Sequence, residues 1–285
     1  MLGGMPSTVP DAAGLRGASA RPRVVATDLD GTLLDPSGAV TDRTRDALHR
    51  LWTLGIETVF VTARPPRWLD ELADHVGGHG VVICANGAFV YDVETARVVE
   101  SVGIEPASIV SMTRDVRAHF PRVGFGAERP QGPYLERGYH SPVVGLRDLV
   151  PPAGLEHGPI EAVGGVVGKL LARDPSTPDE EFIETVAAIV GERGVVAYSG
   201  ADGLAEIGPP GVSKATALHA WCAARGIAAH EVWAFGDMPN DLPMLHWAGR
   251  SFAMSNGHDL VRAAATDVCA GNDDDGVART LETIA

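Results

Sequence analysis

Short apolar runs alternate with longer amphipathic segments in the first third of the chain. The apolar runs lie at residues 23–27, 57–61 and 81–84. Runs of this length and character are typical of strands buried on both faces of a parallel sheet. Between them we expect one helix over residues 41–54 and another through Trp68 and Leu72. This alternation predicts an α/β fold built on a parallel, doubly wound sheet.

The pattern changes after Tyr91 and resumes near residue 204. The intervening segment carries Gly and Pro clusters and one clear amphipathic helix around Phe182 to Val190. The resumed pattern predicts a helix at residues 213–225. It also predicts three strands, at residues 204–207, 232–235 and 251–254. A segment inserted between two halves of one α/β domain is the simplest explanation of this order.

The domain organisation follows from these changes of pattern. We expect a core domain of residues 21–91 and 198–285, interrupted by an inserted α/β cap domain of residues 92–197. Residues 1–20 are rich in Gly, Ala, Ser and Pro and lack the apolar stretch of a signal peptide. We expect them to form a disordered tail.

Composition limits the classes of partner. The chain has 285 residues, of which 45% are hydrophobic and 21% charged, which is ordinary for a soluble globular protein. A formal net charge of -14 disfavours nucleic acid and anionic membranes as partners. It leaves an anionic small substrate open, because a metal ion and a few basic residues can reverse the field of one pocket. No apolar stretch approaches the roughly 20 residues that span a bilayer, so no membrane partner is expected.

Cysteine and histidine spacing argues against disulfide and zinc sites. The three cysteines, Cys84, Cys222 and Cys269, lie far apart with no CxxC pair, and we expect thiols of the core. The ten histidines show no HExxH pattern, so no zinc site is expected. These features favour a reducing, cytoplasmic setting.

A pair of carboxylates follows the first predicted strand. Asp28 and Asp30 stand two positions apart and precede Gly31 and Thr32. Carboxylates so close raise each other's pKa unless a cation neutralises them, and Mg²⁺ prefers such oxygen ligands. An EF-hand calcium loop is excluded, because its sixth and twelfth positions would be Leu33 and Ala39. A solvated acidic turn stays open from this run alone.

Three further runs lie where strands end or helices begin. Asp237 and Asp241 follow the strand at residues 232–235, where a turn with an Asp helix cap is the alternative. Lys214 follows Ser213, a plausible N-cap, and would stand near a positive helix end suited to phosphate. A surface lysine is the alternative there. Thr62 offers a hydroxyl at the end of the second strand, next to the amide of Ala63.

Together these four runs resemble the motifs of the haloacid dehalogenase superfamily, and specifically its Cof-type phosphatases with a type IIB cap. Further matching runs are Cys84-Ala85-Asn86-Gly87-Ala88, Phe252-Ala253-Met254-Ser255-Asn256 and Asp273-Asp274-Asp275-Gly276-Val277. The resemblance covers about residues 23–284 with the order and spacing of the motifs intact, whereas the cap matches in size and position only. It implies a Rossmann-like core with an inserted cap of the C2B type.

The resemblance also implies a two-step phosphoryl transfer. Asp28 would attack phosphorus and form a phosphoaspartyl intermediate. Asp30 would protonate the leaving oxygen and then deprotonate the hydrolytic water. Mg²⁺ would be held by Asp28, the backbone carbonyl of Asp30 and Asp237, with Asp241 as an outer ligand or orienting residue.

The implied phosphate ligands complete this site. The equatorial oxygens would be held by Thr62, the amide of Ala63 and Lys214, and Asn240 would reach the phosphate or the metal shell. The sequence departs from the family pattern at three positions, namely Ala63 for Gly in TGR, Ala215 for Gly after the lysine, and Met238 for Ser after GD. None of these changes removes a charged group, so they bear on positioning rather than on the type of reaction.

The expected substrate is a small phosphomonoester, and sugar phosphates, nucleotides and a flavin-precursor phosphate are all compatible. A polar and aromatic cluster of the cap is a candidate reader of the leaving group, with Arg129, Tyr134, Arg137, Tyr139 and His140 as its members. Two alternatives are a phosphomutase of sugar phosphates and a phosphoryl-binding protein without turnover. The protein is expected to be a monomer or a homodimer.

Overall fold

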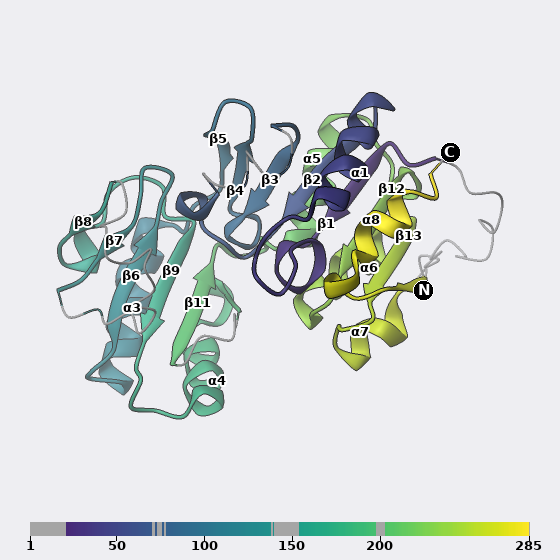
Figure 1. Ribbon diagram of the computed structural model, residues 1–285. Coiled ribbons are helices and arrows are strands. Elements are labelled where there is room, and N and C mark those ends of the chain that lie inside the picture. The colour runs from purple at the N-terminus through teal and green to yellow at the C-terminus, as the bar shows by residue number, and fades with distance from the viewer. Residues whose placement is uncertain are drawn as a thin grey trace, which may run out of the picture.

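The computed structural model consists of two sheets with their covering helices, one beside the other (Figure 1). It describes residues 21–69, 72, 76, 78–137, 139, 154–197 and 203–284. The expected tail at residues 1–20 lies outside this range. No helix in these ranges is long and apolar enough to cross a membrane.

The larger sheet has eight strands in the order β14-β13-β12-β1-β2-β3-β4-β5. Its parallel strands are β1 (Val24–Thr27), β2 (Glu57–Val61), β3 (Val81–Cys84), β12 (Val232–Gly236), β13 (Arg250–Met254) and β14 (Asp267–Cys269). At one edge, β4 (Phe89–Asp92) and β5 (Arg97–Ser101) continue the sheet in antiparallel pairing. The predicted α/β class with a parallel, doubly wound sheet is confirmed.

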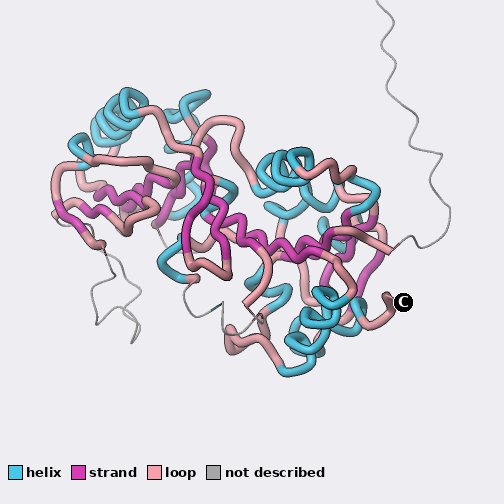
Figure 2. Tube along the Cα trace, turned by 90° about the horizontal axis from the view of Figure 1, so that it is seen from above, coloured by secondary structure: helices cyan, strands magenta, loops and turns pink. Residues whose placement is uncertain are grey.

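Helices cover both faces of the larger sheet, as Figure 2 shows. On one face lie α1 (Asp42–Thr53) and α8 (Gly276–Leu281), and on the other lie α5 (Lys214–Ala224), α6 (Leu242–Trp247) and α7 (Asp259–Ala264). Successive residues of β1 therefore point into two separate cores: Val25 packs under α1 and α8, while Val24 and Ala26 pack under α5 and α6. Burial on both faces explains the continuous apolar runs in the sequence.

Most helices lie where the sequence predicts them. Thr41 caps α1 by accepting a hydrogen bond from the amide of Thr44, and α5 begins after the N-cap Ser213. The helix expected through Trp68 and Leu72 opens as a 3-10 turn, Pro66–Trp68. Most of the positions that follow this turn lie outside the described residues.

The smaller sheet has six strands in the order β10-β11-β9-β6-β7-β8. They are β6 (Gly124–Glu128), β7 (Tyr134–Leu135), β8 (Glu156–His157), β9 (Lys169–Arg173), β10 (Val195–Ala197) and β11 (Leu204–Gly208). Two helices, α3 (Pro106–His119) and α4 (Asp179–Val190), pack on one face of this sheet around Phe125 and Leu170. The other face carries Glu128, Lys169 and Glu206, whose side chains contact the loops of the larger sheet.

The boundaries between the two sheets differ from the expected ones. β5 pairs with β4 in the larger sheet although it lies within residues 92–197, and β11 belongs to the smaller sheet although it lies beyond residue 198. β5 is an exposed edge strand, so it lacks the apolar run that marks its neighbours. β11 carries Ala205 and Ile207 toward α3 and α4, and this alternation resembles that of a core strand.

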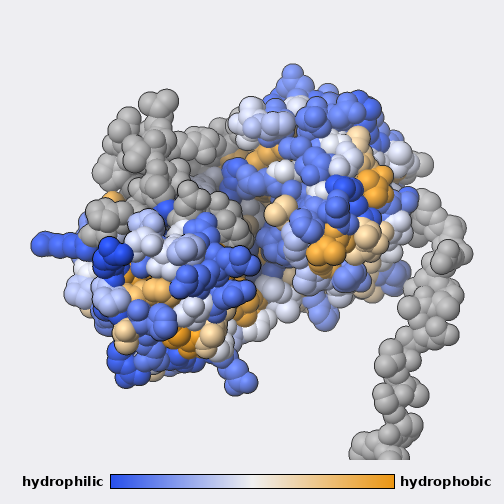
Figure 3. All heavy atoms as spheres, turned by 90° about the horizontal axis from the view of Figure 1, so that it is seen from below, coloured by the Kyte–Doolittle hydropathy of each residue, from blue (hydrophilic) through white to orange (hydrophobic). Residues whose placement is uncertain are grey.

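The surface of the molecule is largely hydrophilic on the face seen in Figure 3, where small hydrophobic patches lie apart from one another on both lobes. Scattered apolar side chains of this kind are normal for the surface of a globular protein. The chemistry is therefore to be sought at the ends of the strands, where loops from separate parts of the chain meet.

Candidate active site

Three neighbouring parallel strands bring the predicted site residues to one edge of the larger sheet. β1 lies between β2 and β12, and the three end at Thr27, Val61 and Gly236. Asp28, Thr62 and Asp237 follow directly, so the carboxyl ends of the strands collect them. The amide of Asp28 donates to the carbonyl oxygen of Phe235 at 3.1 Å, which continues the pairing of β1 and β12 up to the site.

Asp28, Asp237 and Asp241 form a buried carboxylate cluster. One carboxylate oxygen from each lies within 4.8 Å of the others, and all three side chains are buried. In the described ranges this is the one group of three or more acidic, His or Cys side chains close enough to share a metal ion. The structure thus brings together three residues that the sequence analysis assigns to one metal site.

Lys214 enters the same cluster from the first turn of α5. Its Nζ atom lies 2.5 Å from Oδ1 of Asp28 and 2.8 Å from Oδ1 of Asp241, and the side chain is buried. The helix is oriented by a capping box in which Ser213 and Thr216 exchange hydrogen bonds. The alternative of a surface lysine is excluded by this burial.

The charges of the cluster do not balance. Three carboxylates face one ammonium group, so a negative excess is buried. Burial is the largest influence on the pKa of Asp28 and raises it, while Lys214 acts in the opposite direction. Burial and the neighbouring Asp241 raise the pKa of Asp237 to about 6. A divalent cation with a preference for oxygen ligands would relieve this repulsion.

The two aspartates of the turn after β12, Asp237 and Asp241, make different hydrogen bonds. Oδ2 of Asp241 accepts hydrogen bonds from the amides of Asp237 and Met238, both at 3.2 Å, and so fixes the turn from within. Oδ1 of Asp237 accepts one from the hydroxyl of Thr32 at 3.0 Å. The side chain of Met238 is half exposed, so the replacement of the usual serine leaves the cluster intact.

Gly31 lets the loop after Asp28 pass close to Asp237. Its φ of +78° lies in the left-handed region, and a Cβ atom there would lie 2.3 Å from Oδ2 of Asp237. The carbonyl oxygen of Gly31 accepts a hydrogen bond from Nδ2 of Asn256 at 2.9 Å, and Oδ1 of Asn256 accepts one from the amide of Asn272 at 3.0 Å. The run at residues 252–256, which the sequence marks as a motif, thus supports this loop through Asn256, and Asn256 is held in turn by the residue that precedes the run at 273–277.

Thr62, Ala63 and Arg64 form a loop beside the cluster. Oγ1 of Thr62 is buried and accepts a hydrogen bond from the amide of Arg64 at 3.1 Å. Ala63 is not among the residues with positive φ, so its methyl group is accommodated without backbone strain. The amide of Ala63 is therefore as free to serve an anion as that of the usual glycine.

Asp30 lies apart from the buried cluster. Its side chain is more than half exposed and forms a two-point ion pair with Arg64, with Nε to Oδ2 at 2.9 Å and Nη2 to Oδ1 at 2.5 Å. The sequence analysis did not predict this pair, although both residues follow neighbouring strands. The side chain of Asp30 is thus accessible from solvent, whereas that of Asp28 is buried in the cluster.

Asn240 is the predicted site residue that the structure does not bring into the site. Its side chain is exposed and makes no hydrogen bond to any residue in the described ranges. The turn of Pro239–Asp241 aims Asp241 inward and Asn240 outward. A role of Asn240 at the phosphate thus has no contact to support it.

The predicted leaving-group cluster is only partly assembled. Arg129 and Tyr134 contact each other inside the smaller sheet, where Arg129 donates to Gly132 and Tyr134 to Pro159. Tyr139 is the member that lies among the charges between the sheets; burial raises its pKa, whereas the charge of Arg173 acts to lower it. Arg137 is exposed, and His140 lies outside the described residues.

Three charged residues of the smaller sheet contact the core loops instead. Glu128 pairs with Arg67 at 2.8 Å, Lys169 donates to the carbonyl oxygen of Ala63 at 2.8 Å, and Glu206 accepts from Asn86 at 3.3 Å. The sequence analysis missed all three because each strand carries only one or two charges among apolar residues. The sequence feature that could have revealed them is the alternation of charged and apolar residues along these strands, which a sheet with one polar face requires.

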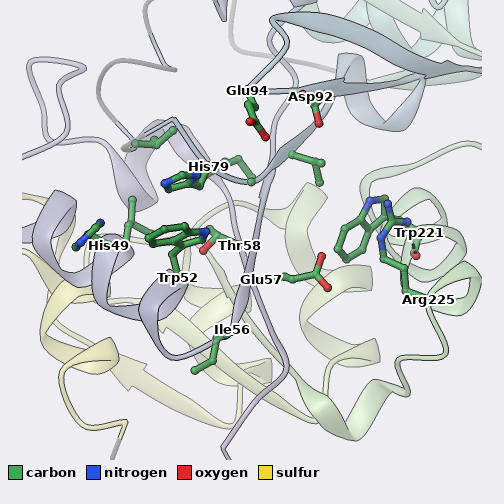
Figure 4. Close-up of a pocket in the computed structure, with 16 residues that line it drawn as sticks. His49, Trp52, Ile56, Glu57, Thr58, His79, Asp92, Glu94, Trp221 and Arg225 are labelled. Carbon is green, nitrogen blue, oxygen red and sulfur yellow. Dashed lines mark hydrogen bonds between the residues drawn. The ribbon is translucent and has the colours of Figure 1, made fainter.

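A cavity of about 480 Å³ opens at the opposite ends of the strands (Figure 4). It lies at the amino ends of β2 and β3, where the rings of Trp52 and His79 stack with centroids 4.2 Å apart. Glu57 and Trp221 line its other side. None of the clustered aspartates lines this cavity, so it is separate from the candidate active site.

Comparison with known proteins agrees with this geometry. A family model described as haloacid dehalogenase-like hydrolase matches residues 25–281. The pyridoxal phosphate phosphatase YbhA of Escherichia coli is 27% identical over 277 residues, which cover 91% of this chain and 97% of that protein. The 5-amino-6-(5-phospho-D-ribitylamino)uracil phosphatase YitU of Bacillus subtilis is 28% identical over 270 residues, which cover 92% and 97%.

A solved structure shares the whole architecture. BT1666 from Bacteroides thetaiotaomicron, described among phosphatases of the haloalkanoate superfamily, superposes with a TM-score of 0.77 at 25% identity. The match covers 96% of this chain and 99% of that one. The family resemblance that the motifs indicate is confirmed.

Proposed function

The chain is a phosphatase of the haloacid dehalogenase-like hydrolase family, and we propose that it hydrolyses a small phosphomonoester through a phosphoaspartyl intermediate on Asp28. The observation that carries the proposal is the position of Asp28 among Lys214, Asp237 and Asp241. A buried carboxylate facing an ammonium group and two further carboxylates suits a nucleophile that must approach an anionic phosphate.

The first step falls to Asp28. Its carboxylate attacks phosphorus, and the bond from phosphorus to the leaving oxygen breaks. Asp30 supplies the proton that the leaving oxygen needs, and its exposed position on the solvent side suits this task. Arg64 must share or release Asp30 during this step, because the ion pair occupies both carboxylate oxygens in the structure.

The second step returns the enzyme to its starting state. Asp30, now deprotonated, takes a proton from a water molecule that attacks the phosphorus of the intermediate; the bond between phosphorus and the Asp28 oxygen breaks, the Asp28 carboxylate is restored, and inorganic phosphate leaves. Thr62, the Ala63 amide and Lys214 hold the equatorial oxygens, where negative charge is stabilised. Asn240 has an exposed side chain in the turn after β12, and its proposed role stays that of reaching the phosphate or the metal shell.

The carboxylate cluster fits Mg²⁺. Asp28, the backbone carbonyl of Asp30 and Asp237 are the ligands we assign, with Asp241 as an orienting residue that also fixes the turn. Carboxylate and carbonyl oxygens are the donors that Mg²⁺ prefers, and a divalent cation would balance the excess of carboxyl groups over ammonium groups in the cluster. When bound, the ion neutralises the nucleophile and the phosphate so that like charges can meet.

The smaller sheet suits the role of a cap over this site. Its open face meets the core through Glu128, Lys169 and Glu206, close to the loop of Thr62 and Ala63. We propose that the core and cap domains divide near the two sheets, with the cap excluding water and selecting the leaving group. Pyridoxal phosphate, sugar phosphates, nucleotides and a flavin-precursor phosphate are the candidate substrates.

The test is release of inorganic phosphate from a panel of these phosphomonoesters and from p-nitrophenyl phosphate, with and without Mg²⁺. We expect release that depends on Mg²⁺ and is removed by EDTA. Formation of an isomeric sugar phosphate without net phosphate release would instead favour a phosphomutase. Phosphate binding without turnover of any ester would favour a phosphoryl-binding protein.

A further inference from the structure

Two consecutive carbonyl oxygens of the Thr62–Arg64 loop are held from outside the loop. That of Thr62 accepts a hydrogen bond from the amide of Asn86 at 3.1 Å, and that of Ala63 accepts one from Nζ of Lys169 at 2.8 Å. Asn86 follows β3 in the larger sheet, whereas Lys169 is the first residue of β9 in the smaller sheet. One of the two supports thus comes from the other sheet.

Glu206 joins the two supports into a ring. Its Oε2 atom lies 2.8 Å from Nζ of Lys169 and accepts a hydrogen bond from Nδ2 of Asn86 at 3.3 Å. Asn86 has a φ of +57°, a left-handed conformation that asparagine adopts more readily than most non-glycine residues. The ring therefore holds both the side chain and the backbone of Asn86 beside the loop.

The ammonium group of Lys169 is buried and held by its partners. Lys169 is 2% exposed. Two of the three N–H donors of its ammonium group are directed at the carbonyl oxygen of Ala63 and at the carboxylate of Glu206. A buried ammonium is stable only where a partner charge and hydrogen bonds surround it, as they do here. The residue is thus part of the joint between the sheets rather than a solvent-facing charge.

The distribution of lysine along the chain also indicates a specific structural role for Lys169. Among the 23 Lys and Arg residues, lysine occurs at positions 169 and 214 alone. Both lysines are buried, and both contact residues of the candidate active site. A compact ammonium group fits such sites, where the planar fork of a guanidinium would need more room.

We infer that Lys169 is a positioning residue for the phosphate-binding loop. Its bond to the carbonyl of Ala63 and the bond of Asn86 to the carbonyl of Thr62 fix the peptide planes on both sides of the Ala63 Cα atom. The bond of Asn86 fixes the plane that carries the Ala63 amide, which we assign to a phosphate oxygen, and the bond of Lys169 fixes the next plane, so that the backbone is held on both sides of Ala63. The inference rests on the proposed function in that assignment, and it makes the cap sheet a support of the phosphate site.

The test compares three variants with the wild type. Lys169→Met removes the donor and keeps the length of the side chain. Lys169→Met with Glu206→Gln also removes the carboxylate that would be left without its ammonium partner, so it guards against a loss caused by misfolding. Arg67→Met is the matched control, because it breaks the ion pair of Arg67 with Glu128 between the same two sheets and touches no carbonyl of the loop.

Three quantities are measured for each protein: the dissociation constant of inorganic phosphate in the presence of Mg²⁺, kcat and KM for p-nitrophenyl phosphate, and the melting temperature. We expect both Lys169 variants to bind phosphate at least about tenfold more weakly and to lose kcat by a similar factor, since small misplacements of a binding group are costly. Arg67→Met should keep the phosphate affinity of the wild type.

Several results would overturn the inference. Unchanged phosphate affinity in Lys169→Met, or an equal loss in Arg67→Met, would show that Lys169 only joins the sheets. Recovery of phosphate affinity in the double variant would assign the loss to the unpaired Glu206. A wild type that binds phosphate but hydrolyses no ester would remove the proposed function while the phosphate affinities still decide the role of Lys169. A wild type that binds no phosphate would remove both.

Discussion

The ammonium group of Lys214 lies 2.5 Å from Oδ1 of Asp28, although 186 positions separate the two residues in the chain. The contact joins the end of β1 to the first turn of α5 in the interior of the protein. A cation at this distance holds the carboxylate in place and offers a positive charge where a phosphate would arrive. The two residues therefore form the structural centre of the proposed reaction.

Replacement of Lys214 by Met should lower kcat strongly while the protein keeps its fold. The variant loses the charge that would stabilise the equatorial oxygens, and we expect kcat for p-nitrophenyl phosphate to fall by about 10²–10³. Steady-state kinetics and circular dichroism at saturating Mg²⁺ check this. A variant that keeps the kcat of the wild type would contradict the assignment of Lys214 to the phosphate.

Replacement of Gly31 by Ala should weaken the metal site, and Gly38→Ala provides a matched control. Both glycines have a similar left-handed φ, +78° and +81°, so both variants pay a similar cost in backbone strain. The new Cβ atom would lie 2.3 Å from Oδ2 of Asp237 in one case and meet nothing within 4 Å in the other. We expect only Gly31→Ala to require a higher Mg²⁺ concentration for half-maximal activity, by about tenfold or more.

The comparison of Gly31→Ala with Gly38→Ala can also contradict this account. A similar Mg²⁺ requirement in the two variants would mean that the closeness of Gly31 and Asp237 is unimportant for the metal site. Melting temperatures of the two variants show whether the strain is indeed comparable.

The stabilisation of the protein by Mg²⁺ should increase with pH. The pKa of Asp237 is raised from 3.8 to about 6, chiefly by burial, so the folded protein binds more protons than the unfolded chain between about pH 4 and 6. The free energy of unfolding without metal therefore falls as pH rises through this range. Mg²⁺ must displace these protons, and it binds best once they are gone.

Thermal unfolding at a fixed Mg²⁺ concentration, with EDTA as reference, measures this effect. We expect a larger rise of the melting temperature at pH 8 than at pH 5 in the wild type, and almost none in Asp237→Asn. A rise that is independent of pH, or that persists in the variant, would remove Asp237 from the metal site.

The core of the fold is predictable from the sequence because its strands are buried on both faces. That burial requires continuous apolar runs, and the strand at residues 57–61 lies where the run predicts it. The exposed edge strand Arg97–Ser101 leaves no such trace. Leu204–Gly208 shows why a local pattern does not assign a strand to a sheet, since its alternation suits either one.

The candidate site is predictable to the extent that its residues follow strands directly. Asp28 and Asp237 meet because β1 and β12 are neighbours, an arrangement that the α/β pattern already favours. The pairing of Asp30 with Arg64 depends on side-chain direction at the ends of two strands, which no spacing reveals. The contact of Lys169 with Ala63 depends on how the two sheets meet, and it joins positions 106 residues apart.

The most direct measurement of the central claim is the trapping of phosphoryl enzyme during turnover of p-nitrophenyl phosphate. Its leaving group needs little protonation, so Asp30→Asn should still complete the first step and then stall. We predict that acid quenching of Asp30→Asn with Mg²⁺ yields protein heavier by one phosphoryl group, located on the peptide that contains Asp28, and that Asp28→Asn yields none. Unmodified Asp30→Asn protein under conditions of continuing turnover, or a phosphoryl group on Asp28→Asn, would contradict the account.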